Sequence, residues 1–466
     1  MTLFLRDIAC LVLQDGARTR LHGVDLLVEE GRVARIGRAL EAPAGAVVVD
    51  ASKHLVLPGL VNTHHHMFQV LTRCVPAAQN SGLFDWLVTH YEIWKHLTQE
   101  AVHASTLAAC AELLLTGCTT TSDHLYLFPR GRGGDLMVAQ AEAAARSGIR
   151  FHMTRGSMSR GRSDGGLPPD DAVEDEEAIL ADSERVIARY HDASPLAMRR
   201  VALAPCSPFS ISEALLRETA ALARRHGVRC HTHIAETRDE EAYCLARYGR
   251  RPLALLEDTG WLGPDVWLAH GIYFDDDELG RLAASGTGIS HCPASNLRLA
   301  SGRARVPAML REGVTVGLGV DGSASNDSSD MLGELRHCLL THRADGEPDA
   351  IDAQRVLDLA TLGGAALLGR VGEIGTLVEG AAGDLIGIDL GRLEYAGALA
   401  DPVAAVLFCG ISHRVDFAAV GGRLLVDGGK LAMLDESAVA GDANRASARV
   451  LAAGGVSLPP SAARLA

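Results

Sequence analysis

The chain has 466 residues, 47% of them hydrophobic, which is enough for one large core and a smaller one. Its formal net charge of −14 argues against nucleic acid and anionic membranes as partners. No stretch of about 18 uncharged apolar residues occurs, so we expect no membrane span. The ten cysteines form no C-x-x-C pair and lie in apolar stretches, which predicts reduced thiols and a cytoplasmic protein.

Short strands and turns occupy both ends of the chain. Residues 1–57 alternate apolar and polar side chains, and Glu30–Gly31 marks the turn of a hairpin. Residues 374–432 return to this pattern, and an alanine-rich helix and tail follow. Neither end has enough strands to close a core alone. We therefore predict one small composite β-sandwich domain, made of residues 1–57 and 372–466.

Between these ends, residues 58–371 alternate apolar strands with helices. The strands are expected at 56–63, 117–122, 149–154, 200–205, 228–233, 266–270, 287–291 and 314–320. Three of the helices between them are expected to end at Gly148, Gly227 and Gly286. Eight such units predict an α/β fold of the (β/α)8 TIM-barrel type, with a doubly wound open sheet as the alternative. Loops after the strands surround the active site of a barrel, so we interpret the charged insertion 155–177 as a lid, with a solvated surface loop as the alternative.

Three adjacent histidines stand at the end of the first barrel strand. Residues i and i+2 of a strand face the same side, so we expect His64 and His66 to point into the barrel mouth and His65 to point away. Imidazoles and carboxylates also end strands five to eight, namely His231, His233, Glu236, His270, His291 and Asp321. Such a gathering at one rim of a barrel predicts a metal site.

Five motifs that occur in order along the chain resemble the amidohydrolase superfamily, and more narrowly its cytosine/guanine deaminase and triazine hydrolase branch. They are PGLVNTHHH, HTHIAET, LAHG, SHCPASN and GLGVDGSASND. The resemblance implies that His64, His66, His233 and Asp321 hold the metal, and that Glu236, three residues after His233, is the catalytic glutamate. Two-metal members bridge their ions with a lysine on strand four, which RVALAPCSPFS lacks. We therefore expect one ion, Zn²⁺, with Fe²⁺ as the alternative.

This set of side chains predicts a hydrolytic deaminase, which replaces an exocyclic amine with a carbonyl and releases ammonia. Zn²⁺ lowers the pKa of a water that it binds to about 7. Asp321 is expected to take a proton from that water, and Glu236 to pass one to a ring nitrogen and then to the leaving amine. His270 is expected to orient the attacking oxygen or to stabilise the charge that develops.

The segment 64–94 resembles the deaminases of 8-oxoguanine and, nearly as closely, those of isoxanthopterin. This resemblance implies a small heterocyclic substrate, an amino-substituted purine or pteridine, with 8-oxoguanine first. We expect the amide of Gln69 to hydrogen bond the edge of the ring and Trp86 to stack on its face. A chlorohydrolase or N-alkylaminohydrolase of s-triazines is the alternative enzyme. A homo-oligomer is also expected.

Two further motifs receive no functional assignment. GRSDG at 161–165 matches the nucleophile elbow of esterases, but no strand immediately precedes it. GLGVDG at 317–322 matches the dinucleotide-binding G-x-G-x-x-G, but it falls on the last barrel strand and not in a first βαβ unit. A dinucleotide-dependent oxidoreductase is therefore kept only as an alternative. A metal-binding scaffold without activity is a further alternative.

Overall fold

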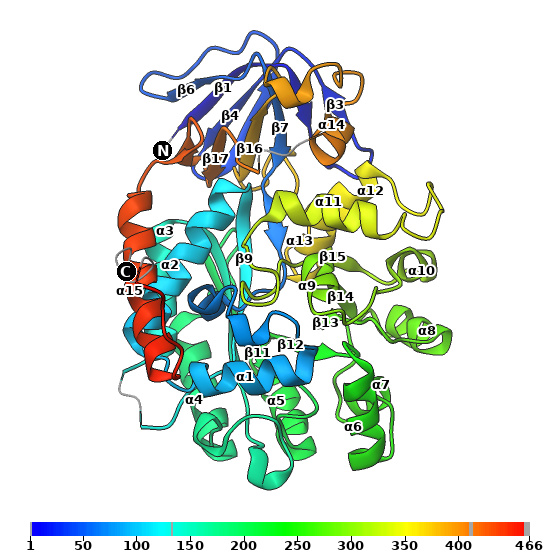
Figure 1. The fold of residues 1–466 in the computed structure, drawn as a ribbon. Helices are drawn as coiled ribbons and strands as arrows, with labels where there is room; N and C mark the ends of the chain where they lie inside the picture. The colour runs from blue at the N-terminus through cyan, green and yellow to red at the C-terminus, as the bar shows by residue number, and fades with distance from the viewer. Residues whose placement is uncertain (1, 132–133, 410–412, 461–466) are drawn as a thin grey trace.

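Strands from the two ends of the chain form two sheets that lie at one end of a barrel (Figure 1). The computed structural model describes residues 2–131, 134–409 and 413–460. The four-stranded sheet has the order β5 (Arg32–Gly37), β4 (Val24–Glu29), β1 (Leu3–Ile8) and β6 (Val47–Asp50). The seven-stranded sheet has the order β19 (Lys430–Leu431), β18 (Arg423–Asp427), β17 (Phe417–Val420), β16 (Leu385–Asp389), β7 (His54–Pro58), β2 (Cys10–Val12) and β3 (Arg20–Leu21).

The two chain ends are joined where β16 pairs antiparallel with β7, with Leu385 opposite Pro58. Apolar side chains from both sheets pack into one buried cluster, which includes Leu5, Leu26 and Leu385. The hairpin between β4 and β5 turns at Glu30 and Gly31, which both have positive φ angles, of 51° and 80°. The predicted composite β-domain is therefore confirmed.

Eight parallel strands form the barrel sheet. Their order is β8 (Leu60–Asn62), β9 (Cys118–Leu125), β10 (Arg150–Ser157), β11 (Arg199–Pro205), β12 (Arg229–Ile234), β13 (Val266–His270), β14 (Gly288–His291) and β15 (Val316–Leu318). Between the first and last strands, the N–H of Thr63 donates to the carbonyl of Leu318 at 3.0 Å, and the N–H of Asp321 to that of His64 at 3.0 Å. These bonds close the ring, so the TIM barrel is confirmed and the open sheet is excluded.

The first predicted strand, 56–63, is divided in the structure. β7 belongs to the terminal sheet, β8 belongs to the barrel, and Gly59 lies between them. Pro58 has no N–H to continue a ladder. A Cβ on Gly59 would lie 2.0 Å from Thr119 Oγ1, so only glycine lets the chain pass here. The sequence predicts a single strand here because apolar residues continue on both sides of the break.

Most of the helices lie around the outside of the barrel. α3 (Leu136–Ser147), α5 (Glu213–Arg225) and α8 (Asp276–Ser285) end near Gly148, Gly227 and Gly286, whose φ angles are 80°, 64° and 74°, as predicted. The other helices are α1 (Leu83–Trp94), α2 (Gln99–Leu115), α4 (Glu176–Tyr190), α6 (Arg238–Tyr248), α7 (Pro252–Asp258), α9 (Pro293–Arg298), α10 (Val306–Glu312), α11 (Met331–Thr341), α12 (Ala353–Asp358), α13 (Gly364–Leu367), α14 (Pro402–Phe408) and α15 (Glu436–Ala453). No helix in the described parts of the chain is both long and apolar enough to cross a membrane.

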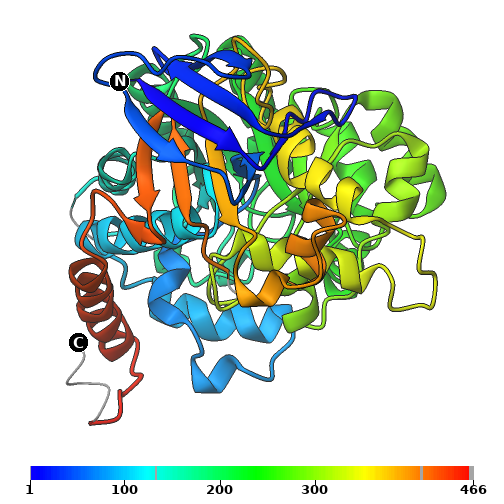
Figure 2. The ribbon, with the colours of Figure 1, turned by 90° about the horizontal axis from the view of Figure 1, so that it is seen from above.

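The C-terminal helix α15 runs along the side of the barrel, next to α2 (Figures 1 and 2). Val439 of α15 packs with Leu107 and Ala111 of α2, and Ser447 Oγ donates to the carbonyl of Leu71 at 2.6 Å. The predicted helix is therefore present, and it covers the barrel. The domain boundaries after residues 57 and 371 stay a prediction, and residues 461–466 of the predicted tail lie outside the described residues.

Candidate metal centre and active site

A cavity lies at the carboxyl ends of the barrel strands, where α1 covers it. The strand ends and the loops after them contribute His66, Gln69, Tyr126, Cys206, Ser207, Phe209, His233, Glu236, His270, Leu299, Asp321 and Ser325. α1 contributes Leu83, Trp86, Leu87 and Tyr91. None of these residues belongs to the insertion 155–177. That insertion instead touches α1 from outside, where Arg162 Nη1 donates to Glu92 Oε1 at 2.7 Å. The part of the molecule that covers the cavity is therefore α1, not the insertion interpreted as a lid.

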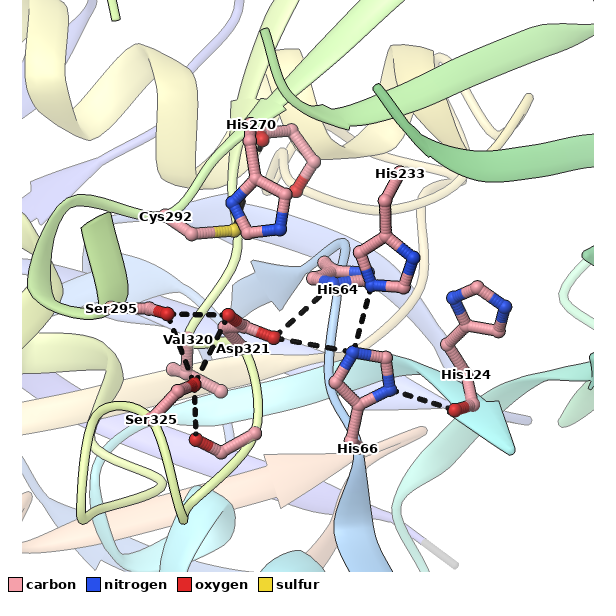
Figure 3. Close-up of polar contacts among 12 residues, drawn as sticks. His64, His66, His124, His233, His270, Cys292, Ser295, Val320, Asp321 and Ser325 are labelled. Atoms are coloured by element: carbon pink, nitrogen blue, oxygen red, sulfur yellow. Dashed lines mark hydrogen bonds and ion pairs between the residues drawn. The ribbon is translucent and has the colours of Figure 1, made fainter. Parts of the chain in front are cut away.

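Three imidazoles and one carboxylate converge at the floor of this cavity (Figure 3). His66 Nε2 lies 2.9 Å from His233 Nε2. Asp321 Oδ1 lies 3.3 Å from the Nε2 atoms of both His64 and His66. The four side chains are almost completely buried. The structure thus brings together the four residues that the sequence singled out as ligands.

The other ring nitrogens decide which atoms carry protons. His66 Nδ1 lies 2.8 Å from the carbonyl of His124, and His233 Nδ1 lies 2.6 Å from the carbonyl of Cys206. A carbonyl oxygen can only accept, so both Nδ1 atoms must carry the proton. Burial lowers the pKa of His66 to about 3, so its ring is neutral. The two Nε2 atoms therefore present lone pairs to each other and cannot form a hydrogen bond.

The same argument extends to His64 through His231. His231 Nδ1 lies 2.8 Å from the carbonyl of Trp267 and must donate to it. Its Nε2 is then an acceptor, and His64 Nδ1 donates to it at 2.7 Å. His64 Nε2 is left as a buried lone pair without a hydrogen-bond partner in the described structure. His231 therefore sets the tautomer of His64, a role that the sequence left open.

Two serine hydroxyls orient Asp321 through Oδ2, the carboxylate oxygen that does not face the imidazoles. Ser295 Oγ and Ser325 Oγ donate to Oδ2 at 2.5 and 3.2 Å, which leaves Oδ1 facing the imidazoles. Its backbone has a φ of 65°, an uncommon angle for a residue with a side chain, and its N–H donates to His64. Four unshared electron pairs from His64, His66, His233 and Asp321 thus meet in a space without a proton between them. Only a cation can balance this repulsion, so the donor set fits a metal ion.

Glu236 and His270 lie beside this centre, with Glu236 Oε2 3.5 Å from His270 Nε2. Burial raises the pKa of Glu236 to about 7, so the group exchanges a proton near neutral pH. Burial alone would lower the pKa of His270, but the carboxylates of Glu236 and Asp321 raise it above its usual value. His270 Nδ1 lies 2.9 Å from Asn296 Oδ1, which fixes the ring. This pair can hold and move a proton at the edge of the cavity.

His124 and Asp123 are site residues that the sequence reading missed. The second strand was expected to stop at residue 122, but β9 continues to Leu125 and carries His124 to the rim. The His124 ring stacks on that of His233, with centroids 4.8 Å apart, and His124 Nε2 donates to the carbonyl of Ala204 at 2.7 Å. Asp123 accepts the N–H of Met67 at 2.7 Å and so anchors the chain just after His66. A histidine two residues beyond the predicted strand end was the signal available.

Two other histidines of the predicted rim point away from the centre. His65 Nε2 lies 2.9 Å from Ser329 Oγ and is not part of the cavity, as the i, i+2 argument predicted. His291 Nε2 lies 3.2 Å from His342 Nε2 of the segment that follows α11. His291, the last residue of β14, is buried and does not line the cavity.

The last strand approaches the site closely because it carries glycines. A Cβ on Gly319 would lie 2.8 Å from His64 Cβ, and one on Gly322 would lie 1.9 Å from Gln69 Oε1. The glycines of GLGVDG therefore make room for a ligand histidine and for Gln69. This explains the motif without a dinucleotide. Gln69 and Trp86, the two residues expected to contact substrate, both line the cavity.

Similarity to known proteins agrees with this geometry. The model of the Amidohydrolase family matches residues 55–425. The chain is 48% identical to the 8-oxoguanine deaminase of Pseudomonas aeruginosa over 92% of this chain and 95% of that protein. It is 37% identical to an isoxanthopterin deaminase from an unknown prokaryotic organism over 88% of each protein.

Among solved structures, the atrazine chlorohydrolase of Arthrobacter aurescens in complex with zinc superposes with a TM-score of 0.91 and 31% identity, covering 96% of this chain and 100% of that one. The family predicted from the five motifs, the barrel predicted from the alternation of strands and helices, and the hydrolytic deaminase are confirmed, and a metal ion as cofactor is supported. This chain belongs to the amidohydrolase family.

Proposed function

We propose that the protein hydrolyses the exocyclic C–N bond of an amino-substituted purine or pteridine, and that 8-oxoguanine is its main substrate. In that reaction one water adds to 8-oxoguanine, and urate and ammonia leave. The observation that carries the proposal is the set of lone pairs from His64, His66, His233 and Asp321 that face one another beside Glu236.

These four residues would hold one ion, with zinc preferred because three of the four donors are imidazole nitrogens. A bound zinc ion supplies a Lewis acid that makes water nucleophilic near neutral pH. The chain's own contribution begins with orientation. His231 fixes the His64 ring, carbonyl groups fix His66 and His233, and the Ser295 and Ser325 hydroxyls fix Asp321.

Proton transfer falls to Asp321 and Glu236. Asp321 Oδ1 faces the imidazoles and accepts from no hydroxyl among the described residues, so beside the lone pair that would hold the ion it has a second one that can accept the proton given up by the attacking water. Glu236, with a pKa of about 7, can be protonated at neutral pH and donate to a ring nitrogen, and it can later pass a proton to the departing amine. His270 lies within 3.5 Å of Glu236 and can stabilise negative charge on the attacked carbon's oxygen.

The substrate preference rests on likeness and on cavity chemistry together. Of the relatives named above, the one with 48% identity is a deaminase of 8-oxoguanine, and the one with 37% identity is a deaminase of isoxanthopterin. The cavity offers aromatic walls and the Gln69 amide, which suit a flat ring with amide edges. The homo-oligomeric state and the cytoplasmic location expected from the sequence stay predictions.

Ammonia release from a panel of heterocycles tests the proposal. We expect 8-oxoguanine to have the highest kcat/KM, isoxanthopterin to follow, and guanine, cytosine and melamine to react far more slowly. Chloride or alkylamine release from s-triazines, without ammonia from purines, would show instead the activity carried by the structurally similar chlorohydrolase. If zinc-loaded protein turned over none of these compounds, the remaining interpretation would be a metal-binding scaffold without activity.

A further inference from the structure

Two hydrogen-bond donors on α1 line the cavity without a partner. Trp86 Nε1 and Tyr91 Oη are both buried, and neither has a hydrogen-bond partner among the described residues. Both residues line the cavity that Glu236 and His270 also line. A buried N–H or O–H without a partner is unfavourable, so two in one wall call for an explanation.

Comparison with the other tryptophans shows that the missing hydrogen bond is particular to Trp86. The chain has four tryptophans, and the remaining three all donate from Nε1. Trp94 donates to Thr72 Oγ1 at 2.9 Å, Trp261 to the carbonyl of Leu216 at 2.8 Å, and Trp267 to the carbonyl of Thr63 at 3.0 Å. Of the four, only Trp86, which lines the cavity, has no acceptor for its Nε1–H among the residues that the structure describes.

The tyrosines of the cavity give the same contrast. Tyr126, which follows β9, also lines the cavity, and the amide of Gln69 interacts with its hydroxyl, whereas the Tyr91 hydroxyl of α1 has no hydrogen-bond partner among the described residues. Burial raises the pKa of Tyr91 well above its usual range, so the hydroxyl keeps its proton. The Trp94 ring packs edge-on against both Trp86 and Tyr91, with centroids 5.4 and 5.9 Å away, which holds the two donors in place.

We propose that Trp86 Nε1–H and Tyr91 Oη–H form a subsite for a carbonyl oxygen on the ring that does not carry the amine. A carbonyl oxygen has two lone pairs and can accept from both donors at once. This inference rests on the proposed function, because it takes the amine-bearing carbon to lie at the metal centre, so that the second ring extends toward α1. The subsite defines the substrate class as bicyclic amino-heterocycles that are oxidised on their second ring.

8-Oxoguanine and isoxanthopterin both belong to this class. Guanine has the same amine and the same pyrimidinone ring as 8-oxoguanine, but at C8 it has a C–H instead of a carbonyl. It would leave both donors buried and unpaired, and a site built to hydrogen bond a substrate group rejects an analogue that lacks it. The two donors on α1 thus select against an ordinary purine base.

The test compares Tyr91→Phe with the parent enzyme on 8-oxoguanine and guanine. We expect kcat/KM for 8-oxoguanine to fall about 10- to 100-fold while that for guanine changes less than about twofold, and Trp86→Phe to act in the same direction. Tyr395→Phe, which alters a buried tyrosine outside the cavity, is the matched control and should leave the ratio unchanged. An equal loss with both bases would overturn the subsite, because the hydroxyl would then act on the shared ring or on folding.

Binding measured by calorimetry gives a second reading that does not need turnover. Urate keeps the C8 carbonyl and xanthine lacks it, so Tyr91→Phe should weaken urate binding about 10- to 100-fold and leave xanthine binding unchanged. Equal weakening of both, or no change in either, would contradict the subsite. If Tyr91→Phe weakens binding of urate but not of xanthine while the parent protein deaminates neither base, the proposed function fails and the subsite stands, so the two failures are distinguishable.

Discussion

His66 Nε2 and His233 Nε2 lie 2.9 Å apart, and neither can donate to the other because each ring already donates from Nδ1 to a backbone carbonyl. This arrangement is unfavourable unless a cation lies between the two nitrogens. Removing the ion with a chelator should therefore lower the melting temperature, measured by scanning calorimetry. The lost stabilisation is expected to be about 4 kcal/mol if free metal had been at 1,000 times its Kd. Added Zn²⁺ should restore the transition and Mg²⁺ should not; unchanged melting after complete metal removal would contradict the site.

His231 should control metal affinity although it is not a ligand. Its Nε2 accepts the proton of His64 Nδ1 at 2.7 Å and so keeps His64 Nε2 free. His231→Phe removes this acceptor, and we expect the affinity for Zn²⁺ to fall about 10- to 100-fold, measured by competition with a chromogenic chelator. His231→Gln offers a carbonyl oxygen in its place and should retain more affinity. Equal affinities in the parent and the Phe variant would refute this role.

Glu236 should set the alkaline limb of the pH profile. Burial raises its pKa to about 7, so the carboxyl is protonated below that pH and can donate to the substrate. As the pH rises through about 7 the donor is lost, and kcat/KM should fall about tenfold per unit. Glu236→Gln should lower turnover at least 10²-fold, lose this limb and keep its metal. If kcat/KM of the Gln variant still fell as the pH rose through about 7, Glu236 would be excluded as the proton donor.

Arg150 should hold the barrel and the terminal sheets together. Its guanidinium makes two bonds to Asp384, at 2.8 and 2.9 Å, and both side chains are buried. Arg150→Met leaves the Asp384 charge without this partner, and we expect the free energy of unfolding in urea to fall by about 3–5 kcal/mol. Arg150→Met combined with Asp384→Leu should recover much of that loss. A single variant as stable as the parent would show that the pair contributes little.

The fold and the gathering of histidines and acids at one rim could be predicted because they rest on local periodicity, whereas the choice of His233 and Asp321 as ligands came from the resemblance to the family. His64 and His66 share a face since strands repeat every two residues, and His233 and Asp321 meet them because parallel strands end at one rim. The division of the first strand at Gly59 could not be predicted, because the contact with Thr119 that requires glycine is a tertiary one. His124 was not predicted because the second predicted strand ends at residue 122, three residues before the end of β9.

The element that covers the cavity could not be predicted from the sequence for a different reason. The insertion 155–177 has the composition of a lid, yet α1 forms that wall. A helix with buried aromatic residues has the same pattern whether it packs on a core or on a substrate. Trp86 and Tyr91 are distinguished only by the missing partners of their polar atoms, and this information exists only in three dimensions.

Anomalous scattering at the zinc and iron edges, from crystals of protein purified without added metal, tests the central claim most directly. We predict one peak per chain, bounded by Nε2 of His64, His66 and His233 and by Oδ1 of Asp321. Crystals without a peak there, or with the metal held only by the separate group His291, Cys338 and His342, would contradict it.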